Sequence, residues 1–324
     1  MKAIVVVPGQ AGPTLELQVV ADPVPGPTEL LIRVRAASLN RADLRRTQMH
    51  FAGTGAPFVA GLDMAGEVIG MGSAAAGWSV GDRVMAMTNG CYAEQVVVDH
   101  RVALRAPTRL SWAEAAGLPT AYLTAHDALA TAGGMVRGGS VLIQGVTSGV
   151  GIVAVQIAKA LGASLVMGAA RNTARFGRLA ELGMDLGIDA KHDDVVAAAL
   201  QNTAGRGVDV IVDMIGGGAL ATNIACSAIP GRIVSVGRMG GMTDTVDLNE
   251  LARKRISLVG VTFRTRTIED KQRLNERFMA DLGERLADGR LRPIVDRTYP
   301  LAEALAAQAY MASNAHFGKI VLET

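Results

Sequence analysis

Short apolar runs broken by turn-forming residues characterise the first 120 residues. These runs favour β-strands at residues 1–7, 30–36, 65–69 and 94–98, because each is bounded by Gly, Pro or Asp. Residues 22–27 contain three prolines, which exclude a helix between the first two strands. The pattern predicts a β-rich region with little helix.

From Gly138 the pattern changes to apolar strands separated by helices. It predicts strands at residues 140–144, 164–169, 208–213 and 232–236, and helices at 150–161 and 172–182. Gly183 follows the second helix, at the place where a left-handed residue commonly ends a helix. Continuous apolar strands that alternate with helices are typical of a parallel sheet covered on both faces.

The C-terminal residues predict helices at 271–287 and 301–311 and a last strand at 318–322. We expect this part of the chain to return to the β-rich region. The first domain would then be discontinuous, with residues 1–120 and 262–324 around a second domain at 121–261. The expected class is α/β, with a β-rich domain and a doubly wound parallel sheet.

Composition excludes several classes of protein. At 324 residues and 49% hydrophobic content, the chain can bury enough apolar surface to exclude disorder. A net charge of +2 and 4% aromatic residues argue against nucleic-acid binding. No apolar run suits a membrane span or a signal peptide, and Cys91 and Cys226 cannot form a disulfide framework. We expect a cytoplasmic protein without a nucleic-acid or membrane partner.

A loop of small residues at 145–151 follows one predicted strand and opens a helix. Such a turn lets backbone amides and a helix N-terminus approach a pyrophosphate closely. The spacing is not a strict GxGxxG, since Val146 and Ser148 stand at the first two glycine places. In its context the loop predicts dinucleotide binding, and a merely tight strand–helix turn is the alternative.

The end of the next strand indicates which dinucleotide binds. An NAD site has an acidic residue about 20 positions after the glycine loop. Arg171 stands at that place, and Arg175 follows it. Guanidinium groups match phosphate in bidentate geometry, so the sequence favours NADPH over NADH. The alternative is that Arg175 only solvates the start of a helix.

Several motifs together resemble those of the zinc-independent medium-chain dehydrogenase/reductases, specifically the zeta-crystallin-like quinone oxidoreductases. The motifs run along the whole chain, at residues 36–44, 61–68, 81–84, 123–125, 148–151, 237–241 and 318–322. The resemblance implies a GroES-like β-rich catalytic domain and a Rossmann domain, with NADPH in a cleft between them. It also implies hydride transfer to a quinone or another electron-poor alkene or carbonyl, and a homodimer paired through the Rossmann sheet.

The places of the zinc ligands in related enzymes hold other residues here. Zinc-dependent relatives carry a Cys, the His of a Gly-His-Glu motif, and a Cys or Asp before the Rossmann domain. This chain has Asn40, Leu62 and Thr120 at those places, and its five histidines have no ligand spacing. We therefore expect no zinc. Without a metal to polarise an oxygen, quinones and conjugated enones are the favoured substrates.

The resemblance also implies roles for individual residues. Asn40 and Thr124 match positions beside the nicotinamide carboxamide, with a turn cap and a helix N-cap as the respective alternatives. The remaining cofactor positions are Thr147, Ser148, Gly149, Val150, Arg171, Arg175, Gly237, Arg238, Met239, Phe263, Arg264 and Lys319. Lys319 has a solvated edge-strand lysine as its alternative. Asp43 is expected to be structural, paired with a neighbouring Arg or capping a helix.

The expected substrate site is apolar. Phe51 stands where several relatives carry a Tyr, so the phenol is missing and His50 is a candidate proton donor. Phe58 and Met64 suit an aromatic substrate, or are simply the edge of a core. Two other functions stay open: an enoyl or alkenal double-bond reductase, and a catalytically idle NADPH-binding protein with an RNA-binding role.

Overall fold

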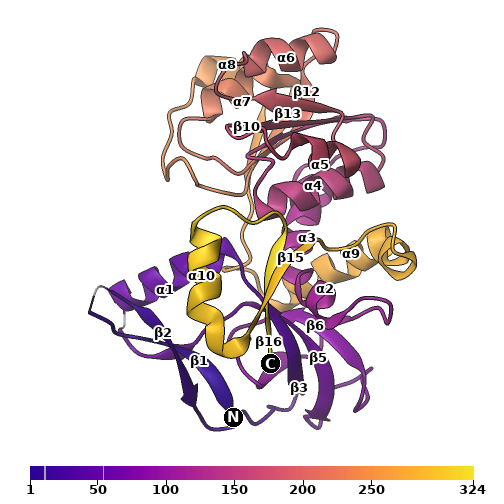
Figure 1. Cartoon of the computed structure of the whole chain (residues 1–324). Helices are drawn as coiled ribbons and strands as arrows, with labels where there is room; N and C mark the ends of the chain where they lie inside the picture. Colours follow the sequence, from indigo (N-terminus) through magenta and orange to yellow (C-terminus); the bar gives the residue numbers. More distant parts are fainter. Residues whose placement is uncertain (11, 54) are drawn as a thin grey trace. The chain divides into compact units, whose positions relative to one another are not determined.

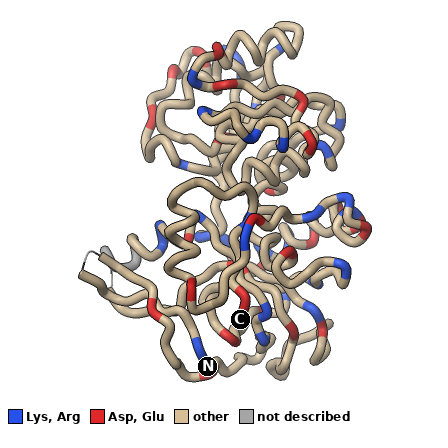
Figure 2. The backbone as a smooth tube through the Cα atoms, in the orientation of Figure 1, with Lys and Arg blue, Asp and Glu red and all other residues tan. Residues whose placement is uncertain are grey.

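A computed structural model describes residues 1–10, 12–53 and 55–324, with side chains for all of these except residues 49–53. The chain divides into two units (Figure 1). Unit 1 consists of Met1–Ala121, Thr267–Met279 and Gly283–Thr324, and unit 2 of Tyr122–Arg266 and Ala280–Leu282. Basic and acidic residues are mixed along both units (Figure 2), as expected for a net charge of +2. None of the helices in the described ranges is both long and apolar enough to cross a membrane.

Unit 1 is the β-rich part of the molecule. Its strands are β1 (Lys2–Val7), β2 (Thr14–Val19), β3 (Glu29–Ser38), β4 (Phe58–Val59), β5 (Asp63–Met71), β6 (Arg83–Met87), β7 (Gln95–Asp99), β8 (Leu104–Arg105), β15 (Val295–Pro300) and β16 (Lys319–Glu323). One sheet has the order β2-β1-β4, and the other has the order β15-β16-β3-β5-β6-β8, with β7 also paired to β3. The apolar faces of β1, β3, β5 and β6 form its core.

The C-terminal strand returns to unit 1 and defines one part of the site. β16 pairs antiparallel with β3, and Val321 lies opposite Ser38. This register brings the start of β16 beside the residues that follow β3. The α/β class and the β-rich first unit expected from the sequence are confirmed.

Unit 1 contains the two C-terminal helices that the sequence predicted, and its first 120 residues contain more helix than the sequence indicated. Its helical elements are α1 (Arg41–Gly53), α2 (Trp112–Ala116), α9 (Ile268–Asp288), η2 (Leu301–Glu303) and α10 (Ala304–Ala312), and α3 (Pro119–His126) crosses into unit 2. The expectation of little helix missed α1, which carries few apolar residues. The start of α1 does carry a local signal, which is an acidic residue three positions after Asn40. The backbone N–H of Asn40 donates to the carboxylate of Asp43 (2.7 Å).

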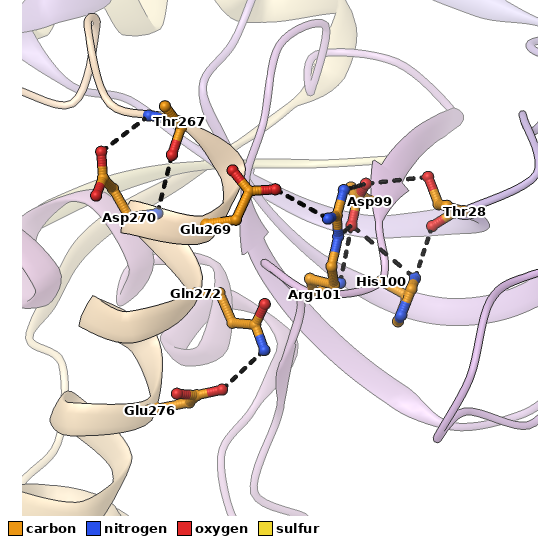
Figure 3. Close-up of polar contacts among 9 residues, drawn as sticks. All are labelled: Thr28, Asp99, His100, Arg101, Thr267, Glu269, Asp270, Gln272 and Glu276. Carbon is orange, nitrogen blue, oxygen red and sulfur yellow. Dashed lines mark hydrogen bonds and ion pairs between the residues drawn. The ribbon is translucent and has the colours of Figure 1, made fainter.

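The first turn of α9 is fixed by a cap and an ion pair (Figure 3). The Thr267 hydroxyl accepts from the Asp270 N–H (3.1 Å), and the Asp270 carboxylate accepts from the Thr267 N–H (3.3 Å). These two hydrogen bonds form a capping box. This box starts the helix three residues before the apolar pattern indicated. Glu269 pairs with Arg101 (3.1 Å), and Arg101 also bonds to Asp99 (2.8 Å). The hydrogen bonds from Arg101 lower the pKa of Asp99 to about 2.

Unit 2 is a doubly wound parallel sheet. Its strands are β9 (Ser140–Gln144), β10 (Leu165–Ala170), β11 (Leu186–Asp189), β12 (Val208–Asp213), β13 (Ser227–Ser235) and β14 (Ser257–Gly260). Their order is β11-β10-β9-β12-β13-β14, and all five pairings are parallel. This is the Rossmann order, in which β10 and β11 lie on one side of β9 and β12, β13 and β14 lie on the other. The expected parallel sheet is confirmed.

The helices of unit 2 connect these strands. They are the π-helix η1 (Asp127–Ala132), α4 (Gly149–Ala160), α5 (Phe176–Glu181), α6 (Val195–Asn202), α7 (Leu220–Cys226) and α8 (Leu248–Arg253). α5 is shorter than the predicted 172–182, because the Asn172 side chain accepts from the Ala174 N–H (3.1 Å) and holds a turn there. Gly183 has φ +106°, as the predicted helix end requires.

Candidate active site

The turn between β9 and α4 has an open helix N-terminus. The N–H groups of Gly145 and Val146 donate to the Ala169 carbonyl (2.9 and 3.2 Å), which fixes the turn to β10. Ser148 caps α4 by accepting from the Gly151 N–H (3.1 Å). A Cβ on Gly149 would find no described heavy atom within 4 Å. Space is therefore open beside Gly149 at the start of α4, where backbone amides can receive a pyrophosphate.

The glycine at 151 has a different role from the glycine at 149. A Cβ on Gly151 would lie 2.6 Å from the Val146 carbonyl oxygen, so helix and turn approach too closely for any side chain. Gly145 has φ +72°, a left-handed conformation that L residues rarely adopt. Two glycines thus build the turn, and the third leaves room above it. This arrangement fits a dinucleotide.

The two arginines lie at the same edge of the sheet as this turn. β10 pairs in parallel with β9, with Ala169 opposite Gln144, so the carboxyl ends of both strands meet there. Arg171 directly follows β10 and is exposed, and Arg175 is half-buried at the start of α5. The structure therefore brings both predicted phosphate ligands to the edge that carries the turn.

Residues 237–240 cover the other side of the turn. The Met239 N–H donates to the Met214 carbonyl (3.3 Å), and the Gly240 N–H donates to the Ile215 carbonyl (2.7 Å). A Cβ on Gly145 would lie 3.0 Å from the Met239 Cε, so that methionine packs against the turn while 49% of it stays exposed. Gly237 is needed there because a Cβ would lie 2.3 Å from the Met214 carbonyl oxygen.

The neighbouring Arg238 bonds to its own segment. Its guanidinium donates to the Val236 carbonyl (3.2 Å). Arg238 lies three residues after the end of β13, at the same carboxyl edge as the turn. Its cofactor role stays a prediction.

An ion pair that the sequence reasoning missed joins the segment 262–266 to Asp127, three residues after Thr124. Thr124 is buried in the middle of α3, so it is not the helix N-cap considered as an alternative. Three residues further along, Asp127 bonds to Arg266 (2.6 Å), and Arg266 donates to the Thr262 carbonyl (3.0 Å). The Arg266 guanidinium also lies 5.5 Å from the centre of the Phe263 ring. The only signal for this pair was a charge within an apolar helical stretch.

Arg264 lies within the same tight segment. It is exposed, and its N–H donates to the Thr262 hydroxyl (3.3 Å). Burial raises the pKa of Asp127, and the Arg266 guanidinium opposes that rise. The cofactor contacts expected for Phe263 and Arg264 stay predictions.

Unit 1 contains a buried cluster of polar side chains around Asp63, which is 0% exposed. One carboxylate oxygen accepts from the Thr120 N–H (3.0 Å) and hydroxyl (2.5 Å). The other accepts from the Asn40 amide (2.8 Å) and the Ser38 hydroxyl (3.3 Å) and lies 3.7 Å from the Lys319 Nζ. Donors therefore surround both oxygens, as a buried carboxylate requires.

Lys319 is an internal residue of this cluster. It is 5% exposed, and its Nζ donates to the Asn40 Oδ1 (2.7 Å). Burial lowers the pKa of its ammonium, and the Asp63 and Asp43 carboxyls oppose that shift. The alternative of a solvated edge-strand lysine is wrong, because pairing of β16 with β3 places this side chain inside unit 1.

Asp43 borders the same cluster. Its Oδ2 accepts from the Asn40 N–H (2.7 Å) and the Tyr92 hydroxyl (3.2 Å), so of the two expected structural roles it takes the helix cap. No group in the described ranges bonds to its Oδ1. Burial raises the pKa of Asp43 to about 7, and the Asp63 carboxylate adds to the rise.

The donor atoms present do not fit a catalytic zinc ion. The three places expected for ligands hold an amide, an apolar side chain and a hydroxyl, at Asn40, Leu62 and Thr120. An ammonium lies beside the amide. Among the side chains that the structure describes, no three His, Cys, Asp or Glu groups could hold a metal ion together.

The predicted substrate residues separate into three cases. Phe58 is half-buried on β4, with the Arg46 guanidinium 5.3 Å from its ring centre. Met64 is 0% exposed in the core of unit 1, in line with the core alternative. The side chains of His50 and Phe51 lie outside the described residues.

Comparison with known proteins agrees with this architecture. The family model of the alcohol dehydrogenase GroES-like domain matches residues 26–109, and that of the zinc-binding dehydrogenases matches residues 182–322. A probable oxidoreductase from Mycobacterium abscessus is 31% identical, with a TM-score of 0.86 over 100% of this chain and 99% of that one.

Two further solved structures and one curated relative are similar. A quinone oxidoreductase from Pseudomonas syringae is 27% identical, with a TM-score of 0.88 over all of both chains. Mycobacterial Rv1454c, solved with NADPH, is 26% identical, with a TM-score of 0.85 over all of both chains. A mycocerosic acid synthase-like polyketide synthase of Mycobacterium tuberculosis is 31% identical over 313 residues, which are 96% of this chain and 15% of that protein. This chain thus spans about one seventh of that relative's length.

These matches cover both units and identify a fold of the alcohol dehydrogenase type. The chain belongs to the medium-chain dehydrogenase/reductase family, on its quinone-oxidoreductase-like branch.

Proposed function

We propose that the chain is an NADPH-dependent reductase that transfers hydride to a quinone without a catalytic zinc ion. The turn at Gly145–Gly151 carries the proposal, because it leaves the N-terminus of α4 open at the sheet edge where Arg171 and Arg175 lie. The NADPH complex of Rv1454c and the similarity to a quinone oxidoreductase support it. The buried free thiols of Cys91 and Cys226 support a cytoplasmic setting.

Each part of the cofactor would have its own set of residues. The backbone amides at Ser148–Val150 would hold the pyrophosphate, and Arg171 and Arg175 the 2′-phosphate. The amide of Asn40 and the hydroxyl of Thr124 would hold the nicotinamide carboxamide. NADPH when bound supplies the hydride, and the protein supplies orientation and exclusion of water.

A quinone suits the donor set around Asn40. A quinone is already a strong hydride acceptor, so its reduction needs no Lewis acid, and its hydroquinone anion takes a proton from water. In the described part of the chain, the Asp63 cluster offers no set of metal ligands. This argues against a substrate whose reduction needs a metal ion to polarise its oxygen. His50 as a proton donor stays a prediction.

A double-bond reductase is the second candidate. Similarity to polyketide synthases, one of which is named a reducing polyketide synthase, supports it. Both candidates use the same cofactor residues and differ in the acceptor.

The test is NADPH oxidation by purified, chelator-treated protein. A small quinone and a conjugated enal are supplied separately, with NADH in place of NADPH as the control and enzyme-free reactions to subtract direct reduction of the quinone. We expect turnover of the quinone with a preference for NADPH. Turnover of the enal alone would favour the second candidate, and failure to bind NADPH would refute both.

A further inference from the structure

We infer that Lys319 and Asp63 are positioning residues that fix the side-chain amide of Asn40 in one orientation. The inference rests on the proposed function, in which Asn40 holds the nicotinamide carboxamide. It assigns to Lys319 a task within unit 1 that differs from direct contact with the cofactor.

The hydrogen-bonding chemistry of the three side chains permits one orientation of the amide. An ammonium can only donate, so the Asn40 atom 2.7 Å from the Lys319 Nζ must be the oxygen. A carboxylate can only accept, so the Asn40 atom 2.8 Å from Asp63 must be the nitrogen. A flipped amide would set N–H groups against an ammonium and a carbonyl against a carboxylate.

Both partners are themselves held in place. Asp63 is fully buried, and Thr120 donates to its other oxygen through the backbone N–H and the hydroxyl (3.0 and 2.5 Å). The aliphatic part of Lys319 packs where a Cβ on Gly117 would lie 3.2 Å from its Cγ. Neither charge can turn toward solvent without disrupting this packing.

The fixed amide retains one N–H and one oxygen lone pair. Asn40 is half-buried, so part of it remains accessible. The carboxamide of a nicotinamide offers one acceptor and one donor group, and it pairs with a second amide only when donors face acceptors. Fixing the flip of Asn40 therefore decides which face of the carboxamide it accepts.

The test removes both charges together. Asp63→Asn with Lys319→Met avoids an uncompensated buried charge. Because Thr120 donates twice at one oxygen position of residue 63, the new amide turns its N–H groups toward Asn40, and the wild-type orientation of the Asn40 amide is no longer favoured. We expect the double variant to lower kcat/KM for NADPH about tenfold, the loss expected for one well-made hydrogen bond. Asn40→Ala should lower it by a similar factor, and Asn40→Ala added to the double variant should lower it no further.

Lys254→Met is the matched control. Lys254 is also buried, but it lies in unit 2 and donates to the carbonyls of Ile224, Ala225 and Ser227 (2.9, 2.7 and 3.1 Å). We expect this variant to have a lower melting temperature. Its kcat/KM should equal that of the wild type when both are assayed well below that temperature. Losses that multiply when Asn40→Ala is combined with the double variant would overturn the inference, and so would an unchanged kcat/KM in the double variant.

A second readout does not depend on activity. In the ¹H–¹⁵N spectrum of the wild-type chain, we expect slow hydrogen exchange for the side-chain N–H of Asn40 that donates to Asp63. In the double variant we expect this side-chain proton to exchange fast. If the wild-type chain fails to bind NADPH, the proposed function fails and this measurement alone decides the inference. Equal protection in both proteins would refute the inference even where the enzyme assay supports the proposed function.

Discussion

Arg171 and Arg175 follow β10 at the edge that carries the cofactor turn, and their charge is the proposed basis of NADPH selection. We expect Arg171→Ala with Arg175→Ala to raise the Kd for NADPH about tenfold or more, because charge-assisted contacts to the 2′-phosphate are lost. The Kd for NADH should barely change. Fluorescence titration with each cofactor measures both.

Arg206→Ala is the control for this pair. Arg206 is exposed and precedes β12, at the opposite edge of the parallel sheet. It should leave both dissociation constants unchanged. An equal loss of NADPH and NADH affinity in the double variant would show that the two arginines do not bind the 2′-phosphate of NADPH.

Asp43 makes the stability of the chain depend on pH. Its folded-state pKa of about 7 lies above the ordinary aspartate value of 3.8, so the folded chain keeps a proton that the unfolded chain releases. The free energy of unfolding therefore falls as the pH rises from about 4 to about 7, by about 4 kcal/mol in total from this group. Below pH 4 both states are protonated, and Asp43 contributes nothing there.

Asp43→Asn should remove this pH dependence. An Asn side chain keeps an oxygen that can accept from the Asn40 N–H and the Tyr92 hydroxyl. Denaturant unfolding at pH 5 and pH 8 should show the wild type losing about 2–3 kcal/mol more than the variant between the two conditions. Parallel losses in both proteins would contradict a raised pKa at this site.

At the scale of the element, the start of α4 combines a structural glycine and a binding glycine. Gly149→Ala adds a methyl group in open space, so it should leave the melting temperature unchanged and weaken NADPH binding about tenfold. Gly151→Ala would place its methyl 2.6 Å from the Val146 carbonyl oxygen and should lower the melting temperature. Differential scanning fluorimetry and a binding titration on both variants separate the effects. Undiminished binding in Gly149→Ala would remove this turn from the cofactor site.

Elements with a strong local signal could be predicted from the sequence, and those defined by long-range contacts could not. β9 and the left-handed Gly183 follow from an apolar run and a glycine position. α1 was missed because its polar residues give no helical apolar period, and its start depends on the single carboxylate of Asp43. The span of α5 was wrong because the Asn172 turn competes with the helix for the same residues.

The same distinction applies to the candidate site. The small residues of the turn and the arginines after β10 are close in sequence, so their spacing showed them. Lys319 meets Asn40 across 279 residues, and Arg266 meets Asp127 across 139, only because strand register and helix ends bring them together. No local pattern encodes such pairs.

At the scale of the whole molecule, the edge of the six-stranded sheet is the expected dimer contact. β14 is the last strand of that sheet, and Leu258 on it is 48% exposed. An edge strand with an exposed apolar side chain can pair with a second copy. We expect a homodimer by light scattering, and Leu258→Asp should shift it toward monomer while NADPH binding persists. A monomeric wild type would refute this expectation.

The buried ammonium of Lys319 has a consequence for protein engineering and for evolution. Cysteine or histidine at positions 40, 62 and 120 would supply zinc ligands, yet the incoming dication would meet a positive charge bonded to the side chain at position 40. Replacing Lys319 alone instead leaves the Asp63 carboxylate buried without a cation. We therefore expect that a zinc site can be built at these positions only when the ligand residues and Lys319 are changed together.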